Sequence, residues 1–150
     1  MAKSYNRIWV HAIWATKNRT NLIESNMEDQ LYAYMAKKFK ENGCPVWIIN
    51  GHKNHVHCLF LLNPHMTLDE IIQRVKGSSS HFVNSNDLIP QKFRWQAGYR
   101  SFSVSESASK RVYQYIKNQK EHHRKKTFIE EYQAFIKLHK LELEGDKILK

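Results

Sequence analysis

The chain has 150 residues, enough for one domain with a substantial core and too few for two independent domains. It carries 24 Lys and Arg residues against 14 Asp and Glu residues, which gives a formal charge of +10. This excess favours a polyanionic partner, nucleic acid first, although a soluble basic protein without such a partner is the alternative. The sequence shows neither a signal peptide nor the roughly 18 apolar residues of a membrane span, so we expect a cytoplasmic protein without membrane association.

The N-terminal part of the chain is expected to form a strand followed by a helix. Residues 7–16 are rich in β-branched and aromatic side chains, a composition typical of strands. Ser25 and Glu28 have the Ser-x-x-Glu spacing of a capping box. We therefore expect a helix that begins there and ends at Gly43.

Two more strands are expected in the middle of the chain. Residues 45–50 have strand composition, and Asn50-Gly51 is a strong turn signal. Residues 55–62 are apolar apart from two histidines, which is typical of a central strand covered by helices on both faces. The two strands should form an antiparallel hairpin.

A second helix is expected from Thr67, which forms another capping box with Glu70. The segment Gly77–Ser80 should weaken this helix in its middle. Its small, hydroxyl-rich surface beside Lys76 suits a phosphate backbone or, equally well, close packing of the helix against the sheet.

Residues 93–104 combine aromatic and basic side chains and predict a strand, a turn at Gly98 and a second extended piece. Arg94 and Arg100 alternate with the aromatic residues. This composition suits the stacking of unpaired bases beside phosphates, although a core strand with exposed arginines explains it nearly as well.

The remaining chain predicts a helix over residues 106–123 and a last helix from Thr127. The element order matches the split βαβ plan, so we predict an α+β, ferredoxin-like (RRM-like) sheet with additional C-terminal helices. We expect a single domain over residues 1–150, with a core at about 5–136 and a charged tail at 137–150.

The triplet His55-Val56-His57 is the strongest candidate for chemistry. Side chains alternate along a strand, so both imidazoles share one face while Val56 points to the other. Two imidazoles on a rigid strand can provide two metal ligands, although on the triplet alone hydrogen-bonded or solvated histidines are the more common arrangement.

A second candidate group lies on the helix over residues 106–123. Tyr115 and Gln119 are four residues apart and share one face, with His122 about one turn further along. Tyr115 would supply a phenol as nucleophile and Gln119 an amide oxygen as third metal ligand. A tyrosine beside an apolar stripe is more often a core aromatic. On spacing alone, the catalytic and the structural interpretation of Tyr115 are therefore about equally well supported.

Several motifs, taken together in their order and spacing, resemble the single-tyrosine HUH transposases, the TnpA type of small bacterial insertion sequences. The likeness spans roughly Tyr5 to Phe135. The motifs that carry it are His55-Val56-His57-Cys58-Leu59-Phe60, Trp95-Gln96-Ala97-Gly98-Tyr99, Phe102-Ser103-Val104-Ser105, Tyr115-Ile116-Lys117-Asn118-Gln119 and Glu121-His122-His123.

The resemblance implies that His55, His57 and Gln119 bind Mg or Mn and that Tyr115 is the nucleophile. Members of that family cut single-stranded DNA, form a 5′-phosphotyrosine, rejoin strands and recognise hairpins near the ends of the element. They act as homodimers with a merged sheet, and the tyrosine helix of one subunit can complete the other subunit's site.

Other residues complete the predicted site. Many relatives have Asp where this chain has Asn54, which can hydrogen-bond to an imidazole without a charge, and His122 is a second candidate to support the ligands. Tyr113 points about 200° away around the helix and lacks a glutamine four residues on, so we reject it as nucleophile. Six cations are candidates for contacts with DNA: Arg7, Lys76, Arg94, Arg100, Lys110 and Arg111.

Two alternatives remain open at this point. One is a metal-dependent nuclease that uses water and leaves no covalent product. The other is a domesticated regulator that binds hairpin or single-stranded DNA and no longer cuts it, although a pure binder has no need of His55, His57, Tyr115 and Gln119 together.

Overall fold

The protein is described by a computed structural model that places residues 3–123 together with residues 130, 133 and 137. The last helix expected from Thr127, and with it the predicted limits of core and tail, lie largely outside the described residues. None of the described helices is long and apolar enough to span a membrane.

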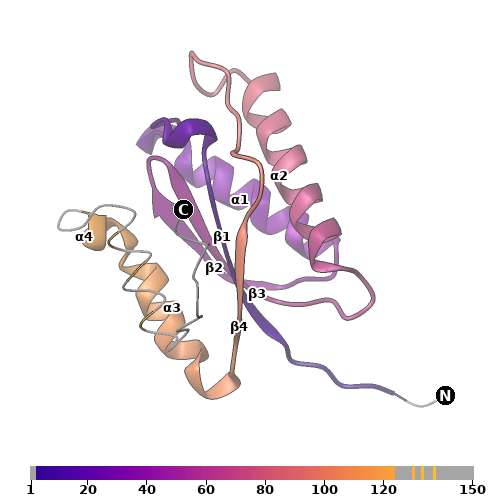
Figure 1. Ribbon diagram of the computed structural model, residues 1–150. Helices are drawn as coiled ribbons and strands as arrows, with labels where there is room; N and C mark the ends of the chain where they lie inside the picture. The colour runs from indigo at the N-terminus through magenta and orange to yellow at the C-terminus, as the bar shows by residue number, and fades with distance from the viewer. Residues whose placement is uncertain (1–2, 124–129, 131–132, 134–136, 138–150) are drawn as a thin grey trace.

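A four-stranded antiparallel sheet forms the centre of the fold (Figure 1). The strands lie in the order β2-β3-β1-β4, and every neighbouring pair is antiparallel. The elements along the chain are β1 (Trp9–Ala15), α1 (Ser25–Glu41), β2 (Val46–His52), β3 (His55–Leu61), α2 (Leu68–Ser85) and β4 (Arg100–Val104). This is the predicted split βαβ arrangement, and the expected α+β, ferredoxin-like fold is confirmed.

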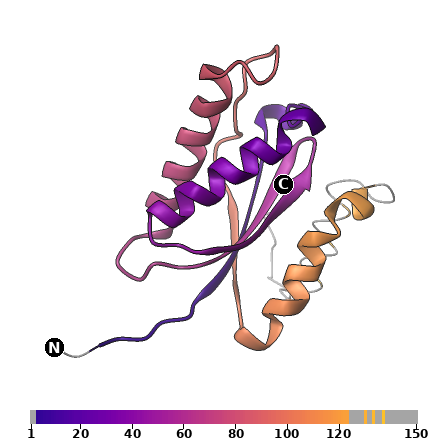
Figure 2. The same cartoon turned by 180° about the vertical axis from the view of Figure 1, so that it is seen from behind.

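Helices cover both faces of the sheet. Helices α1 and α2 lie on one face, and the chain after β4 returns across the other face as α3 (Ser109–Lys117) and α4 (Gln119–His123), as Figures 1 and 2 show. Val56, Cys58 and Phe60 of β3 belong to the core shared with α1 and α2, whereas Leu59 packs with Val112 and the rest of the α3 side. Strand β3 is therefore buried on both faces, and its odd-numbered residues face α3.

The first predicted capping box does not form. Helix α1 begins at Ser25 itself, its N-cap is Glu24, and no side chain caps it. Glu28 instead forms an ion pair with Lys120, whose Nζ lies 2.5 Å from the Glu28 carboxylate. At the second box the Thr67 hydroxyl accepts a hydrogen bond from the backbone N–H of Glu70 at 3.2 Å, so Thr67 caps α2 as predicted.

The predicted turn at Asn50-Gly51 is wrong. Gly51 lies inside β2 and pairs with Val56, and the chain turns at Lys53 and Asn54. Gly51 is required there for a different reason, since a Cβ atom on it would lie 2.2 Å from the backbone oxygen of His55. Strand pairing across a tight contact therefore outweighs the local turn preference.

The structure does not test whether Gly77–Ser80 weakens α2, whereas the extended pieces predicted over residues 93–104 need correction. Helix α2 runs without interruption through Gly77–Ser80, where the serine hydroxyls donate to backbone carbonyls one turn earlier. Of residues 93–104, only Arg100–Val104 forms a strand, while Trp95 makes an isolated bridge with Thr16 and Gly98 adopts φ +88°.

The helix predicted over residues 106–123 is divided into three pieces. A 3₁₀ turn over Glu106–Ala108 precedes α3, and α3 ends at Lys117, with Asn118 as its C-cap, before α4 begins at Gln119. Tyr115 and Gln119 consequently lie on two helical segments instead of one continuous face.

Candidate active site

Three histidines meet on the face of the sheet that α3 covers. His55 and His57 project from β3 and His11 from the neighbouring β1, and all three are buried, at 0%, 2% and 0% exposure. The ring centroids are 5.2 Å apart for His55 and His57, and 5.1 Å apart for His11 and His57. Burial of three imidazoles among apolar residues is costly unless they are hydrogen-bonded or bind a ligand.

His55 lies between two amide side chains. Its Nδ1 is 2.8 Å from Oδ1 of Asn54, and its Nε2 is 3.2 Å from Oε1 of Gln119. Because an amide oxygen only accepts, the contact with Asn54 places the ring hydrogen of neutral His55 on Nδ1. Nε2 then presents a lone pair towards a second acceptor, an arrangement that a bound cation would stabilise.

The break in the helix brings Gln119 to His55. At the end of α3 the amide nitrogen of Asn50 donates to the backbone oxygens of Ile116 and Lys117, at 3.0 and 3.1 Å. Asn118 then leaves the helical conformation, and Gln119 is buried at 0% exposure. The amide nitrogen of Gln119 has no hydrogen-bond partner among the described residues, so only its oxygen is engaged.

Lys120 anchors α4 next to Gln119. Its Nζ lies 3.1 Å from Oδ1 of Asn50 and 3.3 Å from the backbone oxygen of Gly51, and it forms the ion pair with Glu28. These contacts tie α4 to β2 and α1, so the position of Gln119 depends on parts of the chain that are distant in sequence.

Tyr115 is the tyrosine that faces the histidines. Its ring centroid lies 6.0 Å from that of His57 with the rings at 73° to each other, and the residue is half-buried. Tyr113 instead stacks on Trp47 of β2, at 4.7 Å and 26°. The structure therefore brings Tyr115, His55, His57 and Gln119 together and directs Tyr113 away from them.

The described residues contain no group of three or more His, Cys, Asp or Glu side chains arranged to hold a metal ion. A metal at this site would depend on the two imidazoles of β3 and the amide oxygen of Gln119. Such a set carries no charge of its own and leaves coordination positions open for water or for substrate oxygens. The side chain of His122 lies outside the described part of the structure, so its supporting role stays a prediction.

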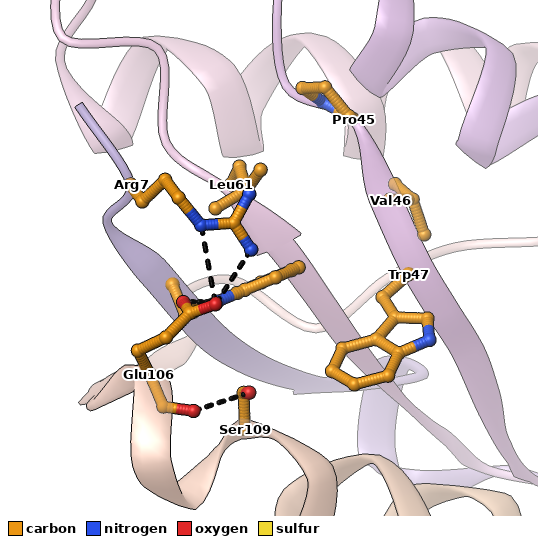
Figure 3. A pocket seen from close by; sticks show the side chains of 8 residues that line it. Arg7, Pro45, Val46, Trp47, Leu61, Glu106 and Ser109 are labelled. Atoms are coloured by element: carbon orange, nitrogen blue, oxygen red, sulfur yellow. Dashed lines mark hydrogen bonds and ion pairs between the residues drawn. The ribbon is translucent and has the colours of Figure 1, made fainter. Parts of the chain in front are cut away.

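Arg7 lies two residues before β1, at the opposite end of that strand from the residue that pairs with His55. Trp9 pairs with Leu61, whereas Ala15 at the other end pairs with His55. Arg7 donates to one Glu106 carboxylate oxygen at 2.8 and 3.2 Å, beside a pocket of about 380 Å³ (Figure 3). The hydrogen bonds from Arg7 and from the Trp9 indole lower the pKa of Glu106.

A basic groove of about 550 Å³ lies between α2 and the segment before β4. Its lining includes four cations: Lys17, Lys76, Lys92 and Arg94. Lys76 Nζ donates to the backbone oxygens of Gln96 and Gly98, both at 2.7 Å, and burial lowers its pKa. Trp95, which also lines the groove, donates its indole N–H to Ser79 at 2.9 Å.

The groove lies at the same end of the sheet as His55. The backbone N–H of Lys17 bonds to the oxygen of Arg94, and that of Thr16 bonds to the oxygen of Asn54, both at 2.9 Å. The sequence analysis did not predict Lys17 or Lys92 as DNA contacts, although Lys92 lies two positions before the predicted contact Arg94. The other predicted cations, Arg100 on β4 and Lys110 and Arg111 on α3, are exposed and lie outside this groove.

His11 is the other residue that the sequence reasoning missed. Its Nε2 lies 2.8 Å from Nδ1 of His57. The sequence offered one indication of its role. His11 is the only histidine of the strand predicted over residues 7–16, and that strand was expected to share a sheet with the His-Val-His triplet. Only the pairing of β1 with β3 shows that the two histidines meet.

Comparison with solved structures shows which proteins share this fold. A structure described as a transposase from Deinococcus radiodurans R1 superimposes with a TM-score of 0.63 at 24% identity, covering 79% of this chain and 98% of that one. A structure of a REP-associated tyrosine transposase bound to a REP hairpin superimposes with a TM-score of 0.59 at 14% identity, covering 82% and 74%. The chain therefore has a fold that is also found in transposases.

Comparison of the sequence with known families shows which family the chain belongs to. The profile of the family described as "Transposase IS200 like" matches residues 4–119, and the chain belongs to this family of DNA transposases. The ISDra2 transposase TnpA of Deinococcus radiodurans is 25% identical over 114 residues, which cover 73% of this chain and 81% of that protein. The resemblance inferred from the motifs is thereby confirmed at the level of the family.

Proposed function

We propose that this transposase cleaves and rejoins single-stranded DNA through a covalent 5′-phosphotyrosine at Tyr115, with Mg or Mn held by His55, His57 and Gln119. The observation that carries the proposal is the approach of Gln119 Oε1 to His55 Nε2 at 3.2 Å, with the Tyr115 ring beside His57. Three separate elements meet at this point.

The donor atoms suit a small divalent cation. Two ligands at right angles around Mg²⁺, each about 2.0–2.1 Å from it, lie about 3 Å apart, close to the separation of the His55 and Gln119 atoms. Asn54 keeps the hydrogen of His55 on the far ring nitrogen, which leaves Nε2 available. When bound, the ion would polarise a phosphoryl oxygen and so favour attack on phosphorus.

The remaining chemistry belongs to Tyr115. Its phenol loses its proton as the oxygen bonds to phosphorus, the bond from phosphorus to the 3′ oxygen breaks, and the departing oxygen takes up a proton to become a free 3′-hydroxyl. The phosphotyrosine conserves the energy of the broken bond. A 3′-hydroxyl can therefore attack it later and release the tyrosine without ATP, which joins the strands.

The decisive experiment compares Tyr115→Phe with Tyr113→Phe on labelled single-stranded DNA from the flanks of the gene, with Mn or with EDTA. Both variants lose one hydroxyl from the same helix, but only Tyr115 faces the histidines. We expect a covalent adduct on a denaturing protein gel for the wild type and Tyr113→Phe in Mn, and none for Tyr115→Phe or in EDTA. An adduct in Tyr115→Phe would disprove the assignment.

The same gels distinguish the alternatives. Cut DNA without an adduct would indicate a nuclease that uses water, and tight binding without any cutting would indicate a regulator. Either result would replace the proposed reaction.

We propose the basic groove as the binding site for hairpin DNA. Lys17, Lys76, Lys92 and Arg94 gather there at the end of the sheet that carries His55, so a hairpin bound in the groove could pass a single strand towards Tyr115. The solved relative bound to a REP hairpin is consistent with such a partner. Hairpin and unpaired strands of equal length, compared in a binding assay, test this preference.

A homodimer is part of the same proposal. Strands β2 and β4 are the two edges of the sheet, and each has an open side among the described residues, where a second copy could add its own sheet. Light scattering over a concentration series would give the mass of the assembly, and a monomer at all concentrations would contradict the proposal.

A further inference from the structure

We propose that His11 is a positioning residue for the metal site: it accepts a hydrogen bond from Nδ1–H of His57 and so directs Nε2 of His57 to the metal. The inference rests on the proposed function and adds a residue to it. Its basis is the contact of 2.8 Å between His11 Nε2 and His57 Nδ1.

The position of His11 is closely constrained. It lies on β1, one of the two central strands of the sheet, opposite Leu59 of β3 and Phe102 of β4. Its exposure is 0% and that of His57 is 2%, so water does not compete for the contact. The two rings lie 5.1 Å apart at 43°, so neither can turn without losing the hydrogen bond.

The chemistry of a ligating imidazole decides which ring donates. Two ring nitrogens 2.8 Å apart share one hydrogen. An imidazole that binds a metal through Nε2 carries its hydrogen on Nδ1. His57 is therefore the donor, His11 Nε2 is the acceptor, and the hydrogen of neutral His11 lies on its own Nδ1.

The two candidate ligands of β3 thus have matching support from different residues. Asn54 engages Nδ1 of His55 with an amide oxygen, and His11 engages Nδ1 of His57 with a ring nitrogen. In both cases Nε2 is the nitrogen that would face the metal. Because its Nε2 already contacts His57, His11 acts through that residue and does not serve as a ligand itself.

The test measures Mn²⁺ binding by calorimetry without DNA, so that no catalytic turnover is involved. His11→Phe keeps an aromatic ring but removes the acceptor, and we expect about 10- to 100-fold weaker binding. His11→Gln places an amide oxygen near the same point and should restore most of the affinity. His81→Phe, a matched change on the exposed side of α2, should leave binding unchanged.

Each outcome is decisive. If folded His11→Phe binds Mn²⁺ as tightly as the wild type, the role of His11 is overturned while the metal site stands. The same holds if folded His11→Gln and His11→Phe bind Mn²⁺ equally weakly. Failure of the wild type to bind Mn²⁺ overturns the metal site and the role of His11 together. If the variants do not fold, ¹⁵N spectra of the wild-type imidazoles decide: a hydrogen on Nδ1 of His57 supports the proposal, and one on Nε2 overturns it.

Discussion

The side-chain amide of Asn50, in strand β2, donates to the backbone oxygen of Ile116 at 3.0 Å and so satisfies the end of α3. Its second contact reaches the oxygen of Lys117 at 3.1 Å, and its own oxygen accepts from Lys120. One residue of the sheet thereby determines where α3 stops and where α4 begins, and with it the position of Gln119.

Asn50→Ala should therefore affect both stability and the proposed metal site. It leaves the partly buried Ile116 carbonyl without its donor, a loss of about 1–3 kcal/mol in the free energy of unfolding. We expect Mn²⁺ affinity to fall as well, because Gln119 loses its anchor. Asn86→Ala is the control, since Asn86 makes an exposed bond to Phe82 at the end of α2. Urea unfolding and calorimetry measure the two effects, and equal behaviour of both variants would contradict the anchoring role.

Gly51→Ala tests the tight pairing of β2 with β3. The added Cβ would lie 2.2 Å from the backbone oxygen of His55, so the strands must separate. We expect a destabilisation of about 1–3 kcal/mol or more, as for other overpacked sites.

Gly77→Ala is the matched control, because a Cβ there meets nothing within 4 Å and the residue lies inside α2. That change should stabilise the protein by about 0.5–1 kcal/mol through the better helix propensity of alanine. Thermal unfolding of the two variants should therefore shift in opposite directions, and a harmless Gly51→Ala would show that the strand pair is more compliant than the geometry indicates.

The sheet was predictable because its signals are local. Alternating and continuous apolar runs identify the strands, and the apolar sequence around His55 and His57 indicates a strand buried on both faces, as is found. The placement of both histidines on one face follows from the same alternation.

The errors come from contacts between distant parts of the chain. The break at Asn118 depends on Asn50, almost seventy residues earlier, and no local preference of the helix reveals it. The Asn50-Gly51 signal fails because the pairing register requires Gly51 within the strand. The role of His11 depends on the register between β1 and β3, which the predicted sheet plan leaves open.

The ion pair between Arg7 and Glu106 should make stability depend on pH in the acidic range. Hydrogen bonds from Arg7 and Trp9 lower the pKa of Glu106 below its usual 4.5, so folding favours the ionised carboxylate. The resulting stabilisation is present above pH 4.5 and is lost as the pH falls through the lower pKa of the folded state.

The measurement compares wild type with Glu106→Gln by urea unfolding between pH 7 and pH 3. The difference in the free energy of unfolding should be largest at neutral pH and shrink below pH 4.5. It should also shrink at 0.5 M NaCl, because both side chains are substantially exposed and salt screens the pair. A difference that grows on acidification would contradict this assignment.

The basic groove predicts how DNA binding should respond to salt. Lys92 and Arg94 line it together with Lys17 and Lys76, and none of its described lining residues is acidic. Lys92→Ala or Arg94→Ala should each weaken binding of a hairpin oligonucleotide to a similar degree for any sequence. Each should also reduce the slope of log affinity against log salt by about one, because one fewer phosphate contact releases fewer counterions.

Lys37→Ala removes a charge from the exposed side of α1, away from the groove, and should leave the slope unchanged. Fluorescence anisotropy over a NaCl series provides the slopes. If Lys37→Ala reduced the slope as much as Arg94→Ala, binding would follow the net charge of the protein, and the groove would have no special part in it.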